Sequence, residues 1–391
     1  MIRLRGITWD HPRGLGGVRA TAAAFEAERD DVGVEWATRS LQAFADEPIE
    51  RLADRFDLIV LDHPAIGEAV ARGRLVPLDE QVPERFIAEQ EAGSVGASAE
   101  SYRWVGHVWA FAIDAAAQVA AYRPDLLERC AAELPRTWDD VQALGERARS
   151  IGSSIAFPTI PVDAVLAFLA ICRSIGEEPC ATADRVVGRD VGAPALELLR
   201  RVVAAAHPES TSWNPPRMLE RMSTTDEIVY CPLAFGYSNY ARPGFRPKLV
   251  RFAPGPAGDD GVPRGTLGGA GLAVSAARPN VDEAIDYARF TADPRIQRTT
   301  YVEGGGQPGH RSAWTDAAVN ASSSGFFADT LAALDAAYLR PRYDGIVGFQ
   351  DSGGELITGW LRDGGDAGAI LGLLDARYRA SLPNDDRRSE T

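Results

Sequence analysis

Strand-like and helix-like segments alternate over the first 73 residues, and this alternation constrains the fold more than any other feature. The strand-like runs are residues 3–9, 33–38 and 57–62, and the helix-like segments are residues 17–29, 49–56 and 66–73. The third run, DLIVLD, is short and mostly apolar, as expected of a strand buried on both faces. Such a series predicts the α/β class, with a parallel sheet, right-handed crossovers and helices on both faces.

The length of the chain predicts two lobes, because 391 residues exceed what one hydrophobic core usually supports. Residues 103–127 form a long β-prone passage without a crossover helix, as expected where a chain leaves one lobe for another. Further helices are expected at residues 138–152, 162–176, 195–207 and 281–292, and strands at residues 227–236 and 265–277. Thr137 is the expected N-cap of the first of these helices, with Asp139 and Asp140 in its first turn.

Charge and composition exclude several classes of function. The formal charge is −14, and a nucleic-acid-binding surface needs clustered basic residues, so we expect no nucleic-acid partner. The best candidate for a membrane span, residues 162–172, is too short and carries Asp163, so we expect no direct membrane insertion. Residues 1–10 show no secretory signal: either the protein is cytoplasmic or a signal is missing from this sequence. No zinc, phosphate-loop or nucleophile motif occurs.

Four passages occur in an order that resembles a known family. The first is FDLIVLDHPAIGEAVARGRLVPLDE, and the second is VGHVWAFAIDAAAQVAAYRPDLLER followed by LPRTWDDVQALGERAR. The third is CPLAFGYSN with the glycine-rich run of residues 265–277, and the fourth is GQPGHRSAW. Together they resemble the family 1 bacterial extracellular solute-binding proteins, which deliver sugars to ABC transporters.

The resemblance implies a two-lobed periplasmic-binding-protein-like fold of type II, in which each lobe is a mostly parallel sheet flanked by helices. The first lobe would comprise residues 1–113 and 269–315, the second residues 114–268 and 316–391, with hinges near residues 114–120, 265–272 and 315–320. The ligand would lie in the cleft between the lobes, outside the carboxyl ends of the strands. The family further implies a monomer without cofactor or catalytic activity, a small-molecule ligand, an ABC permease as partner, and a periplasmic or extracellular location.

The tripeptide Asp-His-Pro occurs twice, at residues 10–12 and 62–64, each time between a strand-like run and a helix-like segment. One interpretation is helix initiation, because Asp is a favoured N-cap and Pro suits the first turn. The other is a binding site, because the family's strand order places the first strand beside the third, which brings both pairs to one cleft wall. The pairs would then hydrogen-bond to ligand hydroxyls or amines, or hold a divalent metal. Their residues are Asp10, His11, Asp62 and His63.

Other candidate ligand-binding residues follow from the resemblance. Asp114 lies in the crossover passage, where the family often has an acidic residue facing the ligand; the alternative is a solvated hinge carboxylate. The sequence AFGYSNY matches a second-lobe loop that presents an aromatic ring to a sugar in the family. Gly269 would permit hinge bending or close backbone approach. The remaining candidates are Trp9, Phe235, Gly236, Tyr237, Asn239 and Gln307.

The sequence thus predicts a substrate-binding protein of an ABC-type transporter that captures a small polar solute, a sugar or a related compound, by hinge closure. A small polar acid, an amine or a betaine stays open as the solute, because the expected site holds imidazole and carboxylate groups. Two alternatives differ in class. One is a metal-dependent enzyme that uses the two Asp-His pairs, and the other is a cytoplasmic ligand sensor.

Overall fold

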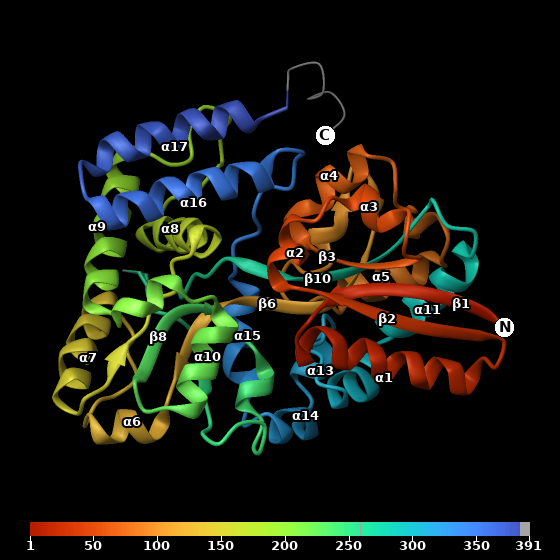
Figure 1. The fold of residues 1–391 in the computed structure, drawn as a ribbon, viewed down its shortest axis with the longest axis horizontal. Coiled ribbons are helices and arrows are strands. Elements are labelled where there is room, and N and C mark those ends of the chain that lie inside the picture. Colours follow the sequence, from red (N-terminus) through yellow and green to blue (C-terminus); the bar gives the residue numbers. More distant parts are fainter. Residues whose placement is uncertain (259, 384–391) are drawn as a thin grey trace.

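Two groups of helices and strands lie on either side of a pair of crossing strands (Figure 1). The computed structural model describes residues 1–258 and 260–383. Its main sheet has the strand order β2-β1-β3-β10-β6-β8-β7, with β9 paired beside β6. The sheet therefore continues from one group to the other. We call these groups the first half, around β1, β2 and β3, and the second half, around β7, β8 and β9.

The first half is built from the strand–helix series that the sequence predicts. Its strands are β1 (Ile2–Trp9), β2 (Val32–Arg39) and β3 (Leu58–Asp62), and its helices are α1 (Pro12–Glu28), α2 (Leu41–Asp46), α3 (Ile49–Ala53), α4 (Ile66–Ala71), α5 (Glu84–Ala92) and α11 (Val281–Ala292). β1 pairs in parallel with β2 and with β3, so the first strand does lie beside the third. Gly73, which follows α4, has a φ of +62°, the left-handed conformation expected of a helix-ending glycine.

Helix α1 begins earlier than the sequence pattern indicates, because His11 caps it and Pro12 occupies its first position. The imidazole Nδ1 of His11 accepts a hydrogen bond from the backbone N–H of Arg13 at 3.0 Å. Gly14 lies inside the helix against the indole ring of Trp9, where a β-carbon would clash with the ring. This glycine therefore lets α1 pack closely on the end of β1.

Two antiparallel strands cross from half to half, β6 (Phe111–Tyr122) and β10 (Leu267–Val274). β10 also pairs with β3 in the first half, and β6 also pairs with β8 and β9 in the second. Gly269 has a φ of +117°, and a β-carbon there would clash with the carbonyl group of Asp114. Only glycine therefore fits this position, next to a β-bulge where the register of β10 on β6 shifts.

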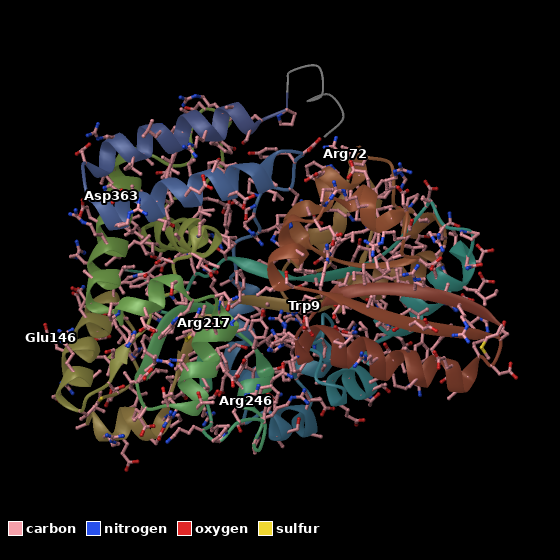
Figure 2. All side chains as sticks on the ribbon, viewed as in Figure 1. Trp9, Arg72, Glu146, Arg217, Arg246 and Asp363 are labelled. Carbon is pink, nitrogen blue, oxygen red and sulfur yellow. The ribbon has the colours of Figure 1, made fainter. Side chains whose placement is uncertain are left out.

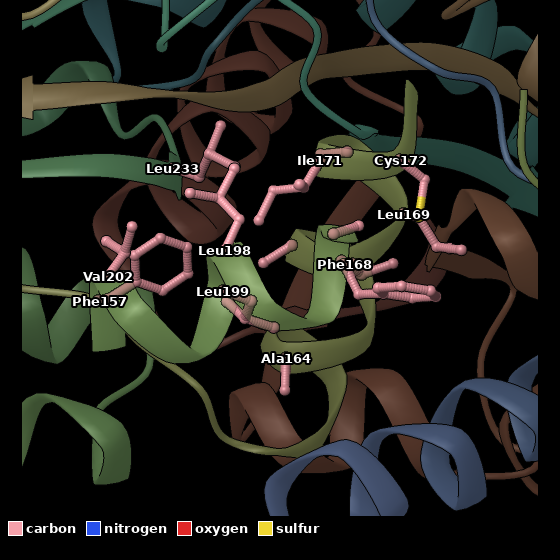
Figure 3. Close-up of a cluster of buried hydrophobic side chains, with 14 of the residues drawn as sticks. Phe157, Ala164, Phe168, Leu169, Ile171, Cys172, Leu198, Leu199, Val202 and Leu233 are labelled. Atoms are coloured by element: carbon pink, nitrogen blue, oxygen red, sulfur yellow. The ribbon is translucent and has the colours of Figure 1, made fainter. Parts of the chain in front are cut away.

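The second half surrounds α8, most of whose side chains are buried (Figure 3). Its helices are α6 (Pro124–Arg129), α7 (Trp138–Ser150), α8 (Pro161–Ile175), α9 (Arg189–Ala205), α10 (Pro215–Thr224), α16 (Ile346–Asp363) and α17 (Ala367–Ser381), and its strands are β7 (Ser154–Ile155), β8 (Ile228–Phe235) and β9 (Arg251–Ala253). Phe157, Phe168 and Leu199 belong to one buried cluster of this half. Thr137 and Asp140 form a capping box at the start of α7, which confirms the predicted N-cap.

The remaining helices lie along the crossing strands and the first half. They are α12 (Pro294–Ile296), α13 (Arg311–Trp314), α14 (Ala317–Ser322) and α15 (Phe326–Asp335), and a short two-stranded ribbon, β4 (Arg103–Trp104) with β5 (His107–Val108), precedes β6. α15 packs against β6 and β9. None of the helices in residues 1–258 and 260–383 combines the length and the hydropathy that spanning a membrane requires.

Candidate functional site

A cavity of about 650 Å³ lies where the two halves meet, a volume that suits a small-molecule ligand. The first half contributes the carboxyl ends of β1 and β3 and helix α2. The second half contributes the N-termini of α8 and α10, the end of β8 and one side of α16. Trp9, the last residue of β1, lies between the two halves in Figure 2.

Six of the residues predicted from the sequence line this cavity. Most of them stand at the carboxyl end of a parallel strand or on a crossing strand, where ligands bind in open α/β sheets. The six residues are Trp9, Asp62, Asp114, Phe235, Tyr237 and Gly269.

Arg13 and Asp114 form a buried ion pair at the cavity. Arg13 Nε donates to Asp114 Oδ2 at 2.9 Å, and Nη2 donates to Oδ1. Arg13 Nη1 donates to the carbonyl oxygen of Gly236 in the second half at 3.0 Å. Burial raises the pKa of Asp114, and the guanidinium opposes this rise. Asp114 is 1% exposed, so the alternative of a solvated hinge carboxylate is wrong.

Asp62 and His63 are adjacent in sequence but differ in surroundings. Asp62 lines the cavity, and its Oδ1 accepts from the backbone N–H of His63 at 2.9 Å. His63 is fully buried and does not line the cavity; Arg340 Nε donates to its Nε2 at 3.1 Å, and the carbonyl oxygen of Leu267 lies 3.2 Å from the same nitrogen. Burial and the charge of Arg340 hold the pKa of His63 well below its usual range, so the ring is neutral at pH 7.

Arg340 is the second buried guanidinium at the cavity, and it joins the two halves. Besides its bond to His63, it donates to Gln350 of α16 and to the carbonyl oxygen of Leu267 on β10 at 3.3 Å. Burial lowers the pKa of Arg340, and the charge of Asp62 partly offsets this lowering. The guanidinium therefore has internal partners on both sides of the cavity.

The cavity wall formed by the second half is acidic. Asp163 lies in the first turn of α8, and Asp351 and Glu355 lie one turn apart on α16. α8 and α16 are in such close contact that a β-carbon at Gly354 would clash with the carbonyl group of Pro161. Burial raises the pKa of Asp163 to about 8. This wall can accept hydrogen bonds from hydroxyl or amine groups of a ligand.

Aromatic rings complete the lining. The ring centroids of Trp9 and Phe44 are 4.9 Å apart, and the guanidinium of Arg13 lies 4.6 Å from the ring centroid of Tyr237. Phe235 ends β8 beside them. The indole N–H of Trp9 is buried without a hydrogen-bond acceptor among the described residues. Apolar rings with a few convergent polar groups are typical of small-molecule sites.

The first Asp-His pair, Asp10 and His11, does not line the cavity. The side chain of Asp10 is exposed, whereas His11 caps α1, so the predicted cap lies one residue later than expected. The ring of His11 packs edge-on against Tyr237 with the centroids 4.7 Å apart. At the second pair the predicted cap is confirmed, because Asp62 caps the 3₁₀ turn of residues 63–65.

Three further predicted residues lie at the junction of the halves but outside the cavity lining: Gly236, Asn239 and Gln307. Gln307 Nε2 donates to the carbonyl oxygen of Ala115 at 2.7 Å, and its Oε1 accepts from the backbone N–H of Ser238 at 2.9 Å. Asn239 Nδ2 donates to the carbonyl oxygen of Gly305 at 3.1 Å. These side chains are used to connect the halves, which is why they do not face the cavity.

The two Asp-His pairs do not form a metal site. His11 is engaged as a helix cap and His63 is bound by Arg340, so the imidazoles do not converge with the carboxylates. Within residues 1–258 and 260–383, no group of three or more His, Cys, Asp or Glu side chains is placed to hold a metal ion. This arrangement does not favour the alternative of a metal-dependent enzyme.

A second hollow, of about 880 Å³, lies among α1, α5, α11 and α12. All of its lining comes from the first half, and its charges include the ion pair of Arg29 with Asp286. Movement of the halves would not enclose a ligand there. We therefore take the cavity between the halves as the candidate site.

Sequence reasoning missed Arg13, Phe44, Asp163 and Arg340 as lining residues. Asp163 had a signal, because it is the single charge in the apolar run of residues 162–172. Arg13 and Arg340 had none, since a lone arginine in a loop or first turn is usually exposed. Their burial depends on partners that lie 101 and 277 positions away, Asp114 and His63.

Two α/β halves that share crossing strands and enclose a small-molecule cavity define a two-lobed ligand-binding protein. Residues 20–324 match the family model described as bacterial extracellular solute-binding protein. The chain belongs to this family, and its role is to bind a solute.

Solved structures of similar fold include the maltose-bound MalE3 of T. maritima, with a TM-score of 0.85 at 16% identity over 98% of this chain and 100% of that one. An ABC transporter solute-binding protein from Agrobacterium radiobacter, in complex with ribitol, gives 0.78 at 18% over 97% and 99%. UgpB from Mycobacterium tuberculosis, in complex with glycerophosphocholine, gives 0.81 at 15% over 100% of both chains. These matches confirm the two-lobed α/β fold predicted from the sequence.

Proposed function

We propose that this protein captures a small, hydroxylated polar solute in the cavity between its halves and presents it to an ABC permease. The single observation that carries the proposal is the lining of the cavity, which draws on both halves and on the crossing strands. A solute held there contacts both walls at once, so it favours the closed arrangement over an open one.

The chemistry of the lining supports a polar solute of moderate size. Carboxyl groups and the amides of Asn214 and Gln350 can pair with hydroxyl groups, and the rings of Trp9 and Phe44 offer apolar faces to a carbon skeleton. The ligands named for the structures of similar fold, maltose, ribitol and glycerophosphocholine, all carry hydroxyl groups. Micromolar affinity corresponds to about −8 kcal/mol, which several buried hydrogen bonds and a ring contact could supply.

Closure would bend the chain where it crosses between the halves. The proposed lobes are those predicted from the sequence. The first comprises residues 1–113 and 269–315, and the second comprises residues 114–268 and 316–391. Residues 384–391, at the end of the second lobe, lie outside the described residues. Gly269 on β10 supports a hinge there, since its positive φ marks a place that only glycine tolerates. We propose that the protein acts as a monomer and without catalysis, in keeping with its family.

The test is a thermal-shift screen of EDTA-treated protein against sugars, polyols, small carboxylates, amines and divalent metals. A solute at a hundred times its dissociation constant should stabilise the protein by about 2.7 kcal/mol, which raises the melting temperature by a few degrees. One organic class that shifts the melt supports the proposal. A response confined to metals, or no response to any class, contradicts it.

A further inference from the structure

We propose that the captured solute carries a cationic nitrogen, which Asp163 on the wall of the second half binds. This inference rests on the proposed function, because it assigns the charge of the solute in the same cavity. Among the described residues that line the cavity, Asp163 is the buried carboxyl group without a partner.

The two guanidinium groups of the cavity have internal partners, and the charge of Arg13 is neutralised by an ion pair. Arg13 makes paired hydrogen bonds to the carboxylate of Asp114 and is 4% exposed. Arg340 is 3% exposed, the charge of Asp62 partly offsets the effect of burial on its pKa, and its N–H groups donate to His63, Gln350 and Leu267. Neither guanidinium is therefore available as the main partner of an anionic solute.

Asp163 has no such match. It is 6% exposed and lines the cavity, and no hydrogen bond or ion pair to it occurs within residues 1–258 and 260–383. Its Oδ2 is buried without any partner. A buried polar atom in this state is costly unless a ligand supplies the missing bond. Asp163 lies in the first turn of α8, and Ile160, the N-cap residue, offers no side chain to cap that helix end.

The groups around Asp163 bring no positive charge to it. Its pKa is raised to about 8 by burial alone, with no contribution from a neighbouring cation. Cys231 on β8 and Tyr237 in the loop after β8 interact electrostatically with Asp163. Burial raises the pKa of both groups, so both are neutral at pH 7. From α16, the carboxyl groups of Asp351 and Glu355 line the same cavity. A solute cation would therefore meet an acidic wall.

Aromatic rings in the lining favour the same ligand charge. The faces of Trp9, Phe44, Phe235 and Tyr237 carry the negative part of the ring quadrupole, which attracts an organic cation. A neutral polyol would use Asp163 differently, because the protonated carboxyl would donate its O–H to a ligand oxygen and keep its proton. A cation instead favours the carboxylate, so binding at pH 7 releases close to one proton from Asp163 to the buffer. The two cases differ in a measurable quantity.

The first experiment is a thermal-shift screen with equal numbers of cationic, neutral and anionic solutes. The cationic set holds amino sugars, amino polyols and betaine-type alcohols, and the neutral set holds the matching sugars, polyols and N-acetylated amino sugars. The inference predicts that cationic members stabilise the protein and that their neutral counterparts do not. Hits among neutral or anionic solutes only would overturn the inference and leave the proposed function standing, whereas no hit in any set would overturn both.

The second experiment applies Asp163→Asn to the strongest cationic hit from the screen. Asn preserves the shape of the side chain and cannot ionise, so the variant should fold, while affinity falls on the order of thirtyfold or more. Asp139→Asn is the matched control, an exposed carboxylate in the first turn of α7, and should leave affinity unchanged. Equal affinity of wild type and Asp163→Asn would overturn the assignment of Asp163.

Calorimetric titration of the same hit in two buffers of different ionisation enthalpy measures the protons released. The wild type should release close to one proton per site at pH 7, and Asp163→Asn should release close to none. Zero release from the wild type would overturn the role of Asp163 as the group that ionises on binding.

Discussion

The guanidinium group of Arg13 makes paired hydrogen bonds to the carboxylate of Asp114, which lies 101 positions further along the chain. Arg13 belongs to the first turn of α1, and Asp114 belongs to the crossing strand β6. A further N–H of the same guanidinium reaches Gly236 in the second half. One side chain thereby ties a helix, a crossing strand and the opposite half together at the candidate site.

Arg13→Met should destabilise the protein by about 3–5 kcal/mol, because it leaves the carboxylate of Asp114 buried without its partner. The double variant Arg13→Met with Asp114→Leu should recover much of this loss, since no unpaired charge then remains. Urea denaturation of the single and double variants measures the difference.

The control for this cycle is the exposed pair of Arg3 and Glu35, whose side chains are 69% and 65% exposed. Breaking that pair with Arg3→Met should cost less than about 1 kcal/mol. An equal loss of unfolding free energy in Arg13→Met and Arg3→Met would contradict the larger stabilisation expected of the buried pair.

His11→Asn should change how stability depends on pH. Burial, followed by the charges of Arg13 and Arg246, lowers the pKa of His11 to about 3 in the folded protein, against about 6.5 for an unperturbed histidine. Between these two values the unfolded state binds more protons, so the wild type loses stability as the pH falls from 6.5 towards 3. The contribution of His11 to this loss is at most about 1.4 kcal/mol per pH unit.

Asparagine is a favoured N-cap and does not titrate, so the variant retains the start of α1 and lacks that loss. Denaturation curves at a series of pH values should show that the stability of His11→Asn relative to wild type rises as the pH falls below 6.5. A constant offset at all pH values would contradict the depressed pKa of His11.

Phe44→Ala should weaken binding of a solute identified in the screen by about two- to tenfold, because it removes one ring from the cavity lining. Phe290→Ala is the matched control. Its ring packs on Phe25 with the centroids 5.3 Å apart, much as Phe44 packs on Trp9, but it lies at the hollow of the first half. Calorimetric titration should show weaker binding for Phe44→Ala only. Weaker binding for Phe290→Ala with unchanged binding for Phe44→Ala would place the solute elsewhere.

Local patterns predicted the fold well because each depends on residues close together in sequence. The apolar run DLIVLD became β3, and the cap at Thr137 and the left-handed Gly73 follow rules that hold within one turn of chain. The end of a strand is also a local feature, but the family's strand order was needed to place Asp62 at the cavity. The β-prone pattern of residues 103–127 already indicated the first crossing strand, whereas the return crossing at β10 was predicted from the family resemblance.

The rest of the site depends on contacts that sequence patterns do not encode. His63 and Asp62 are neighbours in the chain, yet only Asp62 lines the cavity, and the guanidinium that donates to His63 belongs to Arg340, 277 positions further on. Gln307 carries polar groups suited to a ligand, but backbone groups of the other half use them. Side chains of one type can therefore line a cavity or join two halves, and the partner alone distinguishes these roles.

The central claim, that the solute binds in the cavity between the halves, is tested most directly by filling that cavity. Ala65 lines it, follows β3 and is half-buried, so Ala65→Trp adds an indole there without removing any existing contact. Leu373→Trp on α17 is the control, because Leu373 is 51% exposed and does not line the cavity. Calorimetric titration with a solute from the screen should show binding abolished by Ala65→Trp and unchanged by Leu373→Trp. Wild-type affinity in folded Ala65→Trp would contradict the account.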